Sequence, residues 1–398
     1  MSDVYQDSVA LHKKYQGKLG VQSLISVKSR QDLSLAYTPG VAEPCRVIAK
    51  DPQASYDLTM RGRTVAVISD GSAVLGLGNI GAEAAMPVME GKSLLMKEFA
   101  GVDSIPLVIA TQETEEIIKF VKHVAPSFAG INLEDIAAPR CFEVEDALQD
   151  IGIPAFHDDQ HGTAIVVTAA LKNAAKVVGK PFSSLKVVMI GAGAAGLATA
   201  KMLLGLDGPW SALRQLEGIE HIAELKLVDT RGIVYPSRPD VSSAHNRYKA
   251  ALLPFAHTPD QSGDLAAALI GADVVIGVSG PNLVTTEMVK AMAKDAIVFA
   301  MANPMPEILP DDAKAGGAAV VATGRSDFAN QVNNVLAFPG VFKAVIDARL
   351  TKITTEMKYA AAEALAALVP APHETAILPD PFQEGIAESV AKAMIAVK

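Results

Sequence analysis

Two pairs of acidic residues follow apolar stretches of the chain and could hold a metal ion. The pairs are Glu134 with Asp135 and Asp158 with Asp159. The stretches, residues 128–133 and 153–156, are typical of buried strands. Because neighbouring strands end at one edge of an α/β sheet, we expect these carboxylates to converge. Mg²⁺ and Mn²⁺ prefer such hard oxygen ligands, so a divalent metal site is predicted, although each pair could instead cap a helix.

Two further side chains, those of Lys92 and Tyr37, could transfer protons. Lys92 follows Gly91 at the start of an expected amphipathic helix, and Tyr37 lies on a turn that includes Pro39 and Gly40. A lysine buried beside a metal cation would be a usable general base, because desolvation and like charge both disfavour its ammonium form. A solvated helix face for Lys92 and an aromatic anchor for Tyr37 are the alternatives.

Two histidines, His157 and His161, flank the second acidic pair. Histidine favours softer or borderline metals such as zinc, and a zinc site would need more ligands of that kind. We therefore interpret both histidines as structural neighbours of the site.

A glycine motif at residues 191–196 (GAGAAG) follows an apolar stretch, residues 185–190, and precedes an Ala/Leu-rich helical stretch. Gly191 would allow the tight turn, Gly193 the approach of a pyrophosphate, and Gly196 the packing of helix on strand. The phosphates would rest at the helix N-terminus near Ala194. The order of strand, turn and helix predicts a dinucleotide-binding fold, whereas a glycine turn alone would not.

The acidic partner of this motif is expected about 20 residues further on, at the end of the next strand. Asp229 ends the expected strand 225–228 but lies farther along, which an insertion around residues 205–220 would explain. Asp229 should bind a ribose 2′-hydroxyl and favour NAD⁺. Arg231 in the same loop could instead pair with the 2′-phosphate of NADP⁺.

A second glycine pattern, residues 76–81 (GLGNIG), competes with the first one. Residues 70–75 separate it from its upstream strand, and Pro87 falls too soon after it for a long uninterrupted helix. We interpret it as an active-site loop.

Strand and helix alternate along most of the chain, which indicates an α/β protein. We predict an N-terminal α/β domain over residues 1–160 and a doubly wound Rossmann-type dinucleotide-binding domain over residues 161–340. Residues 341–398 should form helices that pack back on the first domain. The expected strands are residues 64–69, 105–110, 185–190, 225–228, 274–278, 296–301 and 319–322, besides the two that precede the acidic pairs.

Composition limits the function classes. The chain has 398 residues and a net charge of −9, and no stripe of Lys and Arg runs along it. Nucleic acids and anionic membranes are therefore poor partner candidates. Two cysteines are too few for a disulfide framework, and no apolar stretch is long enough to span a bilayer. We expect a cytoplasmic protein.

Taken together, these motifs resemble the malic enzyme family, in particular its short bacterial and archaeal branch. The matching segments run in order through most of the chain. They are residues 37–42 (YTPGVA), 69–72 (SDGS), 75–81 (LGLGNIG), 90–92 (EGK), 132–135 (NLED), 156–164 (FHDDQHGTA), 302–304 (ANP), 331–335 (QVNNV) and 338–340 (FPG).

The resemblance implies oxidative decarboxylation of L-malate to pyruvate and CO₂, with reduction of NAD(P)⁺ and a need for Mg²⁺ or Mn²⁺. It implies that Lys92 is the general base and Tyr37 the general acid. Two sets of binding residues follow from it as well. The metal is implied at Glu134, Asp135 and Asp159, and contacts to substrate or nicotinamide at Asn303 and at Asn333 or Asn334.

One departure from the family concerns the substrate carboxylate. Longer members carry an arginine where this chain has Ala73, so the group that holds the carboxylate is open. The resemblance also implies a homodimer or a larger homo-oligomer. Together with Arg231, it leads us to expect a preference for NADP⁺ over NAD⁺.

Two other functions fit parts of the pattern. A two-domain dehydrogenase of the amino-acid dehydrogenase type would share the layout but would not need three carboxylates at two strand ends. A nucleotide-binding protein without chemistry would not need Lys92, Tyr37 and the acidic residues together.

Overall fold

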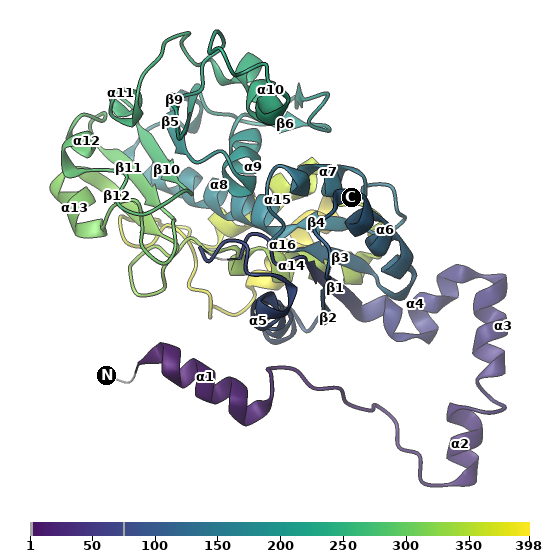
Figure 1. Cartoon of the computed structure of the whole chain (residues 1–398). Helices are drawn as coiled ribbons and strands as arrows, with labels where there is room; N and C mark the ends of the chain where they lie inside the picture. Colours follow the sequence, from purple (N-terminus) through teal and green to yellow (C-terminus); the bar gives the residue numbers. More distant parts are fainter. Residues whose placement is uncertain (1–2, 75) are drawn as a thin grey trace.

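The computed structural model describes residues 3–74 and 76–398, so Met1, Ser2 and Leu75 of the second glycine pattern lie outside the described residues. Two sheets, the first parallel and the second parallel except at one edge strand, form its body (Figure 1). The first sheet has the strand order β2-β1-β3-β4, and all of its pairings are parallel. Its strands are β1 (Thr64–Ser69), β2 (Asp103–Val108), β3 (Gly130–Leu133) and β4 (Ala155–His157).

The second sheet has six strands in the order β12-β11-β10-β5-β8-β9. They are β5 (Lys186–Ile190), β8 (Glu224–Asp229), β9 (Gly232–Ile233), β10 (Val274–Gly277), β11 (Ala296–Ala300) and β12 (Ala318–Thr323). Only β9 pairs antiparallel in it. The chain leaves β5 for β8 on one side and returns to β10 on the other, which creates the switch point where such folds bind ligands. The α/β prediction, with its Rossmann-like second sheet, is confirmed.

The helices of the body cover the two sheets. In the first half of the chain they are α4 (Ser55–Leu58), α5 (Ala82–Ala100), α6 (Thr114–Val124), α7 (Arg140–Asp146) and α8 (Asp158–Val178). Around the second sheet they are α9 (Ala194–Leu203), α10 (Arg247–Ala256), α11 (Leu265–Leu269), α12 (Thr286–Lys290) and α13 (Pro310–Ala315). A small hairpin, β6 (Leu206–Asp207) with β7 (Arg214–Gln215), follows α9 where the insertion was expected.

The chain also contains six short 3₁₀ turns among the described residues. They are η1 (Pro52–Ala54), η2 (Met60–Arg63), η3 (Ala125–Ser127), η4 (Phe182–Ser184), η5 (Ala244–Asn246) and η6 (Asn334–Leu336). Among the described residues, no helix has both the length and the apolar character needed to cross a membrane.

Helix α8 joins the two sheets and is largely buried. It packs against α9 of the second half and against α15 (Thr355–Ala367) from the C-terminal part. The other two C-terminal helices are α14 (Phe338–Ala348), which lies on α5, and α16 (Ile386–Ala396), which packs on α14 and α15. These contacts form one apolar core that fixes α5 and the start of α8 next to each other.

Helix α5 contradicts one expectation from the sequence. It runs for 19 residues and contains Pro87, which was expected to prevent a long helix. Pro87 lies in the second turn, where its missing N–H removes a single backbone hydrogen bond of the helix. Lys18 Nζ donates to the Pro87 carbonyl at 2.6 Å. The uninterrupted helix places Lys92 in its middle rather than at its start.

Residues 4–54 form an arm that differs from the body. It contains α1 (Val4–Tyr15), α2 (Arg30–Ala36) and α3 (Ala42–Lys50), and none of its residues is buried. Figure 1 shows α2 and α3 standing clear of the sheets, with a long extended stretch between α1 and α2. The arm touches α5 at Lys18, whose backbone N–H also donates to Glu90 at 3.1 Å.

Candidate active site

Three of the four predicted carboxylates gather at the carboxyl edge of the first sheet. Glu134 and Asp135 follow β3, and Asp159 lies in the first turn of α8, directly after β4. Their ligand atoms lie within 4.8 Å of one another. Burial raises the pKa of Glu134, and the Asp159 charge adds to this effect against the opposing influence of Lys92. The cluster concentrates negative charge as a divalent cation site requires.

Lys92 of α5 points at this cluster. Its Nζ lies 3.0 Å from Glu134 Oε1, contacts Asp158 Oδ2, and sits 4.5 Å from the centre of the Phe338 ring. Burial acts to lower the pKa of Lys92, but the carboxylates of Asp158, Glu134 and Asp159 outweigh it and hold the pKa well above its usual value. Lys92 is therefore a cation here, not the neutral base that burial alone would produce.

Asp158, although it belongs to the second acidic pair, lies outside the carboxylate cluster and contacts Lys92 instead. Its Oδ2 accepts hydrogen bonds from Lys92 Nζ and, at 2.6 Å, from Asn334 Nδ2. Burial raises the pKa of Asp158 to about 7, although Lys92 opposes the shift. Successive helix residues point about 100° apart, so one adjacent carboxylate faces Lys92 and the other faces the metal cluster. The spacing of the sequence did not indicate which of the two, Asp158 or Asp159, would face Lys92 and which would face the metal cluster.

A cleft of about 500 Å³ connects the carboxylates with the second sheet. Residues from both halves of the chain line it, including Ala73, Asp135, Asp159, Gly193, Ala194, Asn303, Asn333 and Asn334. No Lys or Arg is among the described residues that line it. The arginine missing at Ala73 is thus not replaced by another cation among the described residues of the cleft wall, which includes three asparagines.

The glycine turn has the shape that a dinucleotide needs. A Cβ at Gly196 would lie 2.0 Å from Gly191 O, and one at Gly191 would lie 2.9 Å from Val278 O. At Gly193, by contrast, nothing lies within 4 Å of the Cβ position, and Gly193 caps α9 without a side-chain hydrogen bond. The helix N-terminus is therefore open to a phosphate. These residues fit the cofactor that the motif predicted.

Asp229 ends β8 but is already engaged by cations. Arg238 binds it through two hydrogen bonds of 2.9 and 2.8 Å, and Lys249 Nζ lies 2.6 Å away. Burial acts to raise its pKa, yet the hydrogen bonds from Arg238 and Lys249 hold the pKa well below its usual range. Arg231 is exposed and pairs with Asp240 at 3.0 Å. Sequence reasoning missed Arg238 and Lys249, which approach Asp229 from loop and helix positions up to 20 residues away.

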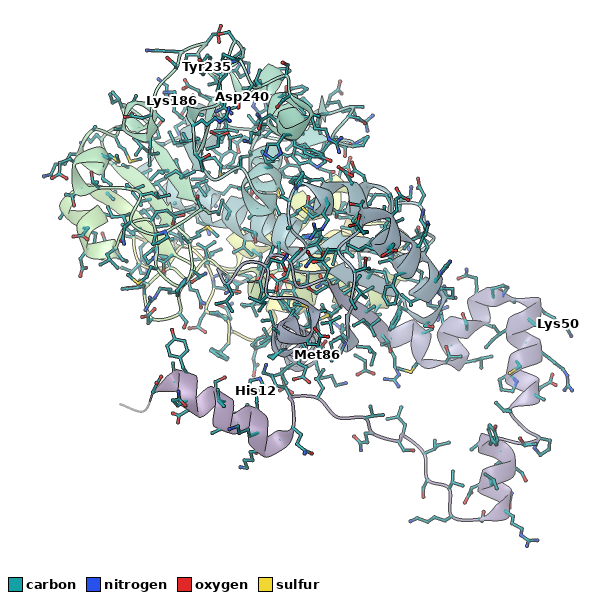
Figure 2. All side chains as sticks on the ribbon, in the orientation of Figure 1. His12, Lys50, Met86, Lys186, Tyr235 and Asp240 are labelled. Atoms are coloured by element: carbon teal, nitrogen blue, oxygen red, sulfur yellow. The ribbon has the colours of Figure 1, made fainter. Side chains whose placement is uncertain are left out.

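Tyr37 is the one predicted catalytic residue that lies away from the cleft. It is the C-terminal cap of α2, in the arm, and 67% of its surface is exposed. Figure 2 shows Lys50, the last residue of α3 in this arm, far from the body. Glu145 accepts a hydrogen bond from the His157 backbone N–H at 3.2 Å and is bonded to His161 Nε2 at 2.9 Å, while His157 Nδ1 lies 3.7 Å from Asp159 Oδ2.

Comparisons with known proteins identify the family of the chain. The family "Malic enzyme, N-terminal domain" matches residues 16–149, and "Malic enzyme, NAD binding domain" matches residues 160–397. The bifunctional malic/malolactic enzyme of Bacillus subtilis is 50% identical over 98% of this chain and 92% of its own length. The NADP-dependent malic enzyme of Halomonas elongata is 46% identical over 92% of this chain and 82% of its own length.

A solved structure shows the same architecture. The NAD-dependent malic enzyme of Thermotoga maritima superposes with a TM-score of 0.90, at 43% identity, over 98% of this chain and 99% of that one. The similar proteins thus include both NAD- and NADP-dependent forms.

Proposed function

This chain belongs to the malic enzyme family, which oxidatively decarboxylates malate with NAD(P)⁺, and from that premise we propose how its own residues divide the reaction. The observation that carries the proposal is the carboxylate cluster, whose ligand atoms lie within 4.8 Å of one another beside Lys92. Three hard oxygen donors, two of them buried, suit Mg²⁺ or Mn²⁺ and leave positions for a chelating substrate. Glu134, Asp135 and Asp159 would hold the ion. When bound, the ion supplies Lewis acidity and NAD(P)⁺ accepts the hydride.

Lys92 takes the proton of the C2 hydroxyl of malate as the hydride leaves. The free carboxylates keep it protonated, so it becomes a base when their charge is offset by a cation. Asp158, held by Asn334, positions the Lys92 ammonium and can receive its proton through their contact. The products of the complete reaction are pyruvate and CO₂.

Tyr37 protonates C3 of the enolate that remains after CO₂ has left, and it does so in the cleft of a second copy of the chain. The arm carries exposed apolar residues and no buried ones, which indicates that another surface covers it in solution. An isologous homodimer in which the arms exchange would supply each cleft with the missing acid.

Asn303 and Asn333 hold the substrate carboxylate in place of an arginine at Ala73. Both line the cleft, where no described Lys or Arg does. An amide donates weaker hydrogen bonds than a guanidinium, so the bound cation carries more of the substrate's charge here.

The preferred cofactor is NADP⁺. Because Arg238 and Lys249 neutralise Asp229, its carboxylate repels a 2′-phosphate little. Arg231 lies in the same loop, is exposed, and is free to turn from Asp240 to a phosphate.

The first experiment measures NADPH or NADH formation from L-malate with Mn²⁺ and after its removal by a chelator. Activity that depends on Mn²⁺ and yields pyruvate supports the proposal. Cofactor reduction that is insensitive to the chelator, or that yields oxaloacetate without CO₂, contradicts it.

A second experiment tests the exchange of arms. Chains carrying Tyr37→Phe and chains carrying Lys92→Ala are co-expressed with different tags. If arms exchange, each mixed dimer regains one complete site, and the equimolar mixture should recover about a quarter of the parent activity. If Tyr37 serves its own chain, no mixture recovers activity.

A further inference from the structure

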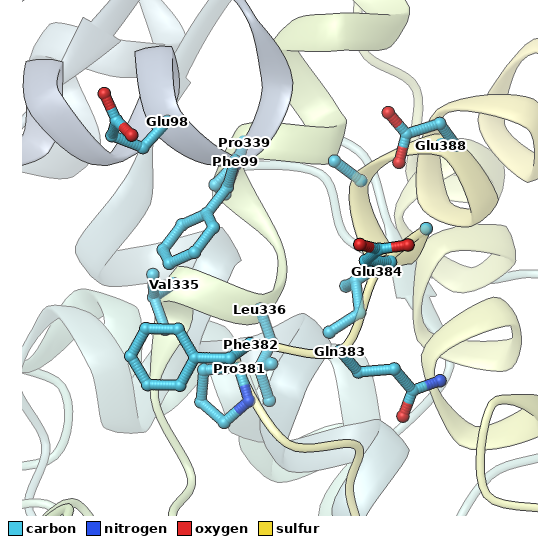
Figure 3. Close-up of a pocket in the computed structure, with 13 residues that line it drawn as sticks. Glu98, Phe99, Val335, Leu336, Pro339, Pro381, Phe382, Gln383, Glu384 and Glu388 are labelled. Atoms are coloured by element: carbon cyan, nitrogen blue, oxygen red, sulfur yellow. The ribbon is translucent and has the colours of Figure 1, made fainter.

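An apolar pocket of about 420 Å³ lies on the surface between the end of α5, η6 and the start of α16. Figure 3 shows Phe99 and Phe382 on its wall with Pro381, Val335 and Leu336, and three carboxylates around it. The Phe99 and Phe382 rings meet edge to face, with centroids 6.0 Å apart. Phe382 is nevertheless 82% exposed. Such an exposed aromatic ring above an apolar pocket indicates a binding surface.

The rim of this pocket is acidic. Glu98, Glu384 and Glu388 line it, and no described Lys or Arg does. A fitting occupant therefore combines apolar side chains with positive charge.

The arm contains one stretch with this composition. Between α1 and α2, residues 21–28 run without helix or strand and carry four apolar side chains exposed by 52% or more: Val21, Leu24, Ile25 and Val27. Lys28 and Arg30 follow at once, and no acidic residue occurs from Gly17 to Arg30. The stretch is thus apolar and basic, and within its own chain none of it is buried.

The pocket also lies close to the active site. Asn334 of η6 contacts Asp158 in the site, and the next two residues line the pocket. Phe338 lies against Lys92, and its neighbour Pro339 lines the pocket. On the arm, α2 separates residues 21–28 from Tyr37 by about 10 Å of helix. On α5, Phe99 follows Lys92 by two turns, about the same distance.

We propose that residues 21–28 of a second copy of the chain dock in the pocket of Phe99 and Phe382, with Lys28 and Arg30 against its acidic rim. The proposal rests on the exchange of arms argued above. The docked stretch anchors the arm and sets where Tyr37 enters the cleft.

Cysteine cross-linking tests this contact directly. Ile25→Cys and Phe382→Cys are introduced into separately tagged, co-expressed chains in a Cys45→Ser background, since Cys45 is the exposed native thiol. Mild oxidation should give a disulfide-linked pair carrying both tags. Gln261→Cys, on an exposed loop before α11, replaces Phe382→Cys as the control and should give none.

A variant that introduces a negative charge tests the same contact independently, through its effect on dimerisation. Leu24→Asp places a carboxylate opposite the acidic rim and should weaken dimerisation about tenfold or more in analytical ultracentrifugation. Ile270→Asp, at an exposed apolar residue that follows α11 in the body, is the matched control and should change dimerisation little. Equal effects of the two variants would count against the pocket.

The outcomes separate this contact from the exchange itself. Rescue of activity in the mixed chains without the cross-link would overturn the pocket and leave the exchange standing. The cross-link without rescue would support the pocket and overturn the role of Tyr37 in the partner's cleft. If neither the rescue of activity nor the cross-link is observed, both the exchange of arms and the docking in the pocket are overturned.

Discussion

The body and the arm of this molecule hold the two side chains that we propose as catalytic in opposite ways. Lys92 is fixed from three sides within the body, by Glu134, Asp158 and the Phe338 ring. Tyr37 caps a short helix of the arm and is two-thirds exposed. The body can therefore preorganise its part of the chemistry alone, whereas the arm needs a second surface to place its acid.

The largest expected effects come from replacing Lys92 and Tyr37 one at a time. Lys92→Ala removes the base and should lower kcat by about 10²–10⁴-fold for malate oxidation and for oxaloacetate reduction alike. Tyr37→Phe should lower pyruvate formation by a similar factor but spare oxaloacetate reduction, because the acid acts after CO₂ has left. Both reactions are followed by the absorbance of the reduced cofactor.

A matched control for Lys92 is available on the same helix. Lys97→Ala removes an exposed lysine that pairs with Asp103 at 2.8 Å, and it should leave both reactions unchanged. Equal loss of both reactions in Tyr37→Phe would mean that the arm contributes more than a late proton.

The next effect concerns metal binding, which belongs to the body alone. Asp159→Asn removes one charge from the cluster and should weaken Mn²⁺ binding about 10- to 100-fold, with a matching rise in the Mn²⁺ needed for turnover. Isothermal titration measures the affinity without substrate. Asp150→Asn, which changes a carboxylate whose side chain is 85% exposed, is the control. An unchanged affinity in Asp159→Asn would remove this residue from the metal site.

Cofactor preference should respond less strongly. Arg231→Ala removes a charge-assisted contact to the 2′-phosphate, which is worth about 1.5–3 kcal/mol, so the ratio of kcat/KM for NADP⁺ over NAD⁺ should fall about ten- to hundredfold. Arg214→Ala, at an exposed arginine paired with Asp207 in the β6–β7 hairpin, is the control. A parent enzyme that prefers NAD⁺, or an unchanged ratio, would show that Arg231 does not read the phosphate.

Much of the body could be predicted because local rules and burial agree there. Strand β1 coincides with the expected residues 64–69, and the glycine turn of Gly191 and Gly196 leaves no room for side chains. Strand ends in a parallel sheet also predicted that Glu134 and Asp159 would meet. These features depend on periodicity and on a few fixed backbone positions.

Other features could not be predicted because they depend on contacts between distant parts of the chain. Arg238 and Lys249 reach Asp229 through folding of a loop and a helix, and Asp158 faces Lys92 because of the direction in which α8 begins. The position of Tyr37 is the strongest case. The motif singled out this residue, but no local pattern indicated that it would lie at an exposed helix end of the arm, away from the cleft.

The smallest expected effect concerns a buried charge of the body that is remote from the chemistry. The side chain of Lys358 in α15 lines a cavity between the two halves of the chain, and among the described residues it has no side-chain ion pair or hydrogen bond. Burial lowers its pKa to about 8, Glu145 opposes the shift, and Lys201 adds to it. The folded state therefore tolerates the charged form of Lys358 poorly.

This shift predicts how stability should change with pH. Between about pH 8 and pH 10.5 the unfolded chain binds more protons at Lys358 than the folded chain does, so the parent gains stability as pH rises through this window. Below pH 8 the cost is fully present and amounts to about 1–3 kcal/mol. Lys358→Met should thus melt a few degrees above the parent near neutral pH and lose that advantage towards pH 10.5. Lys352→Met, at an exposed lysine of the same cavity paired with Asp150, should show no such dependence in calorimetric melting. A Lys358→Met advantage that stays constant with pH would reflect better packing and not the removal of a buried charge.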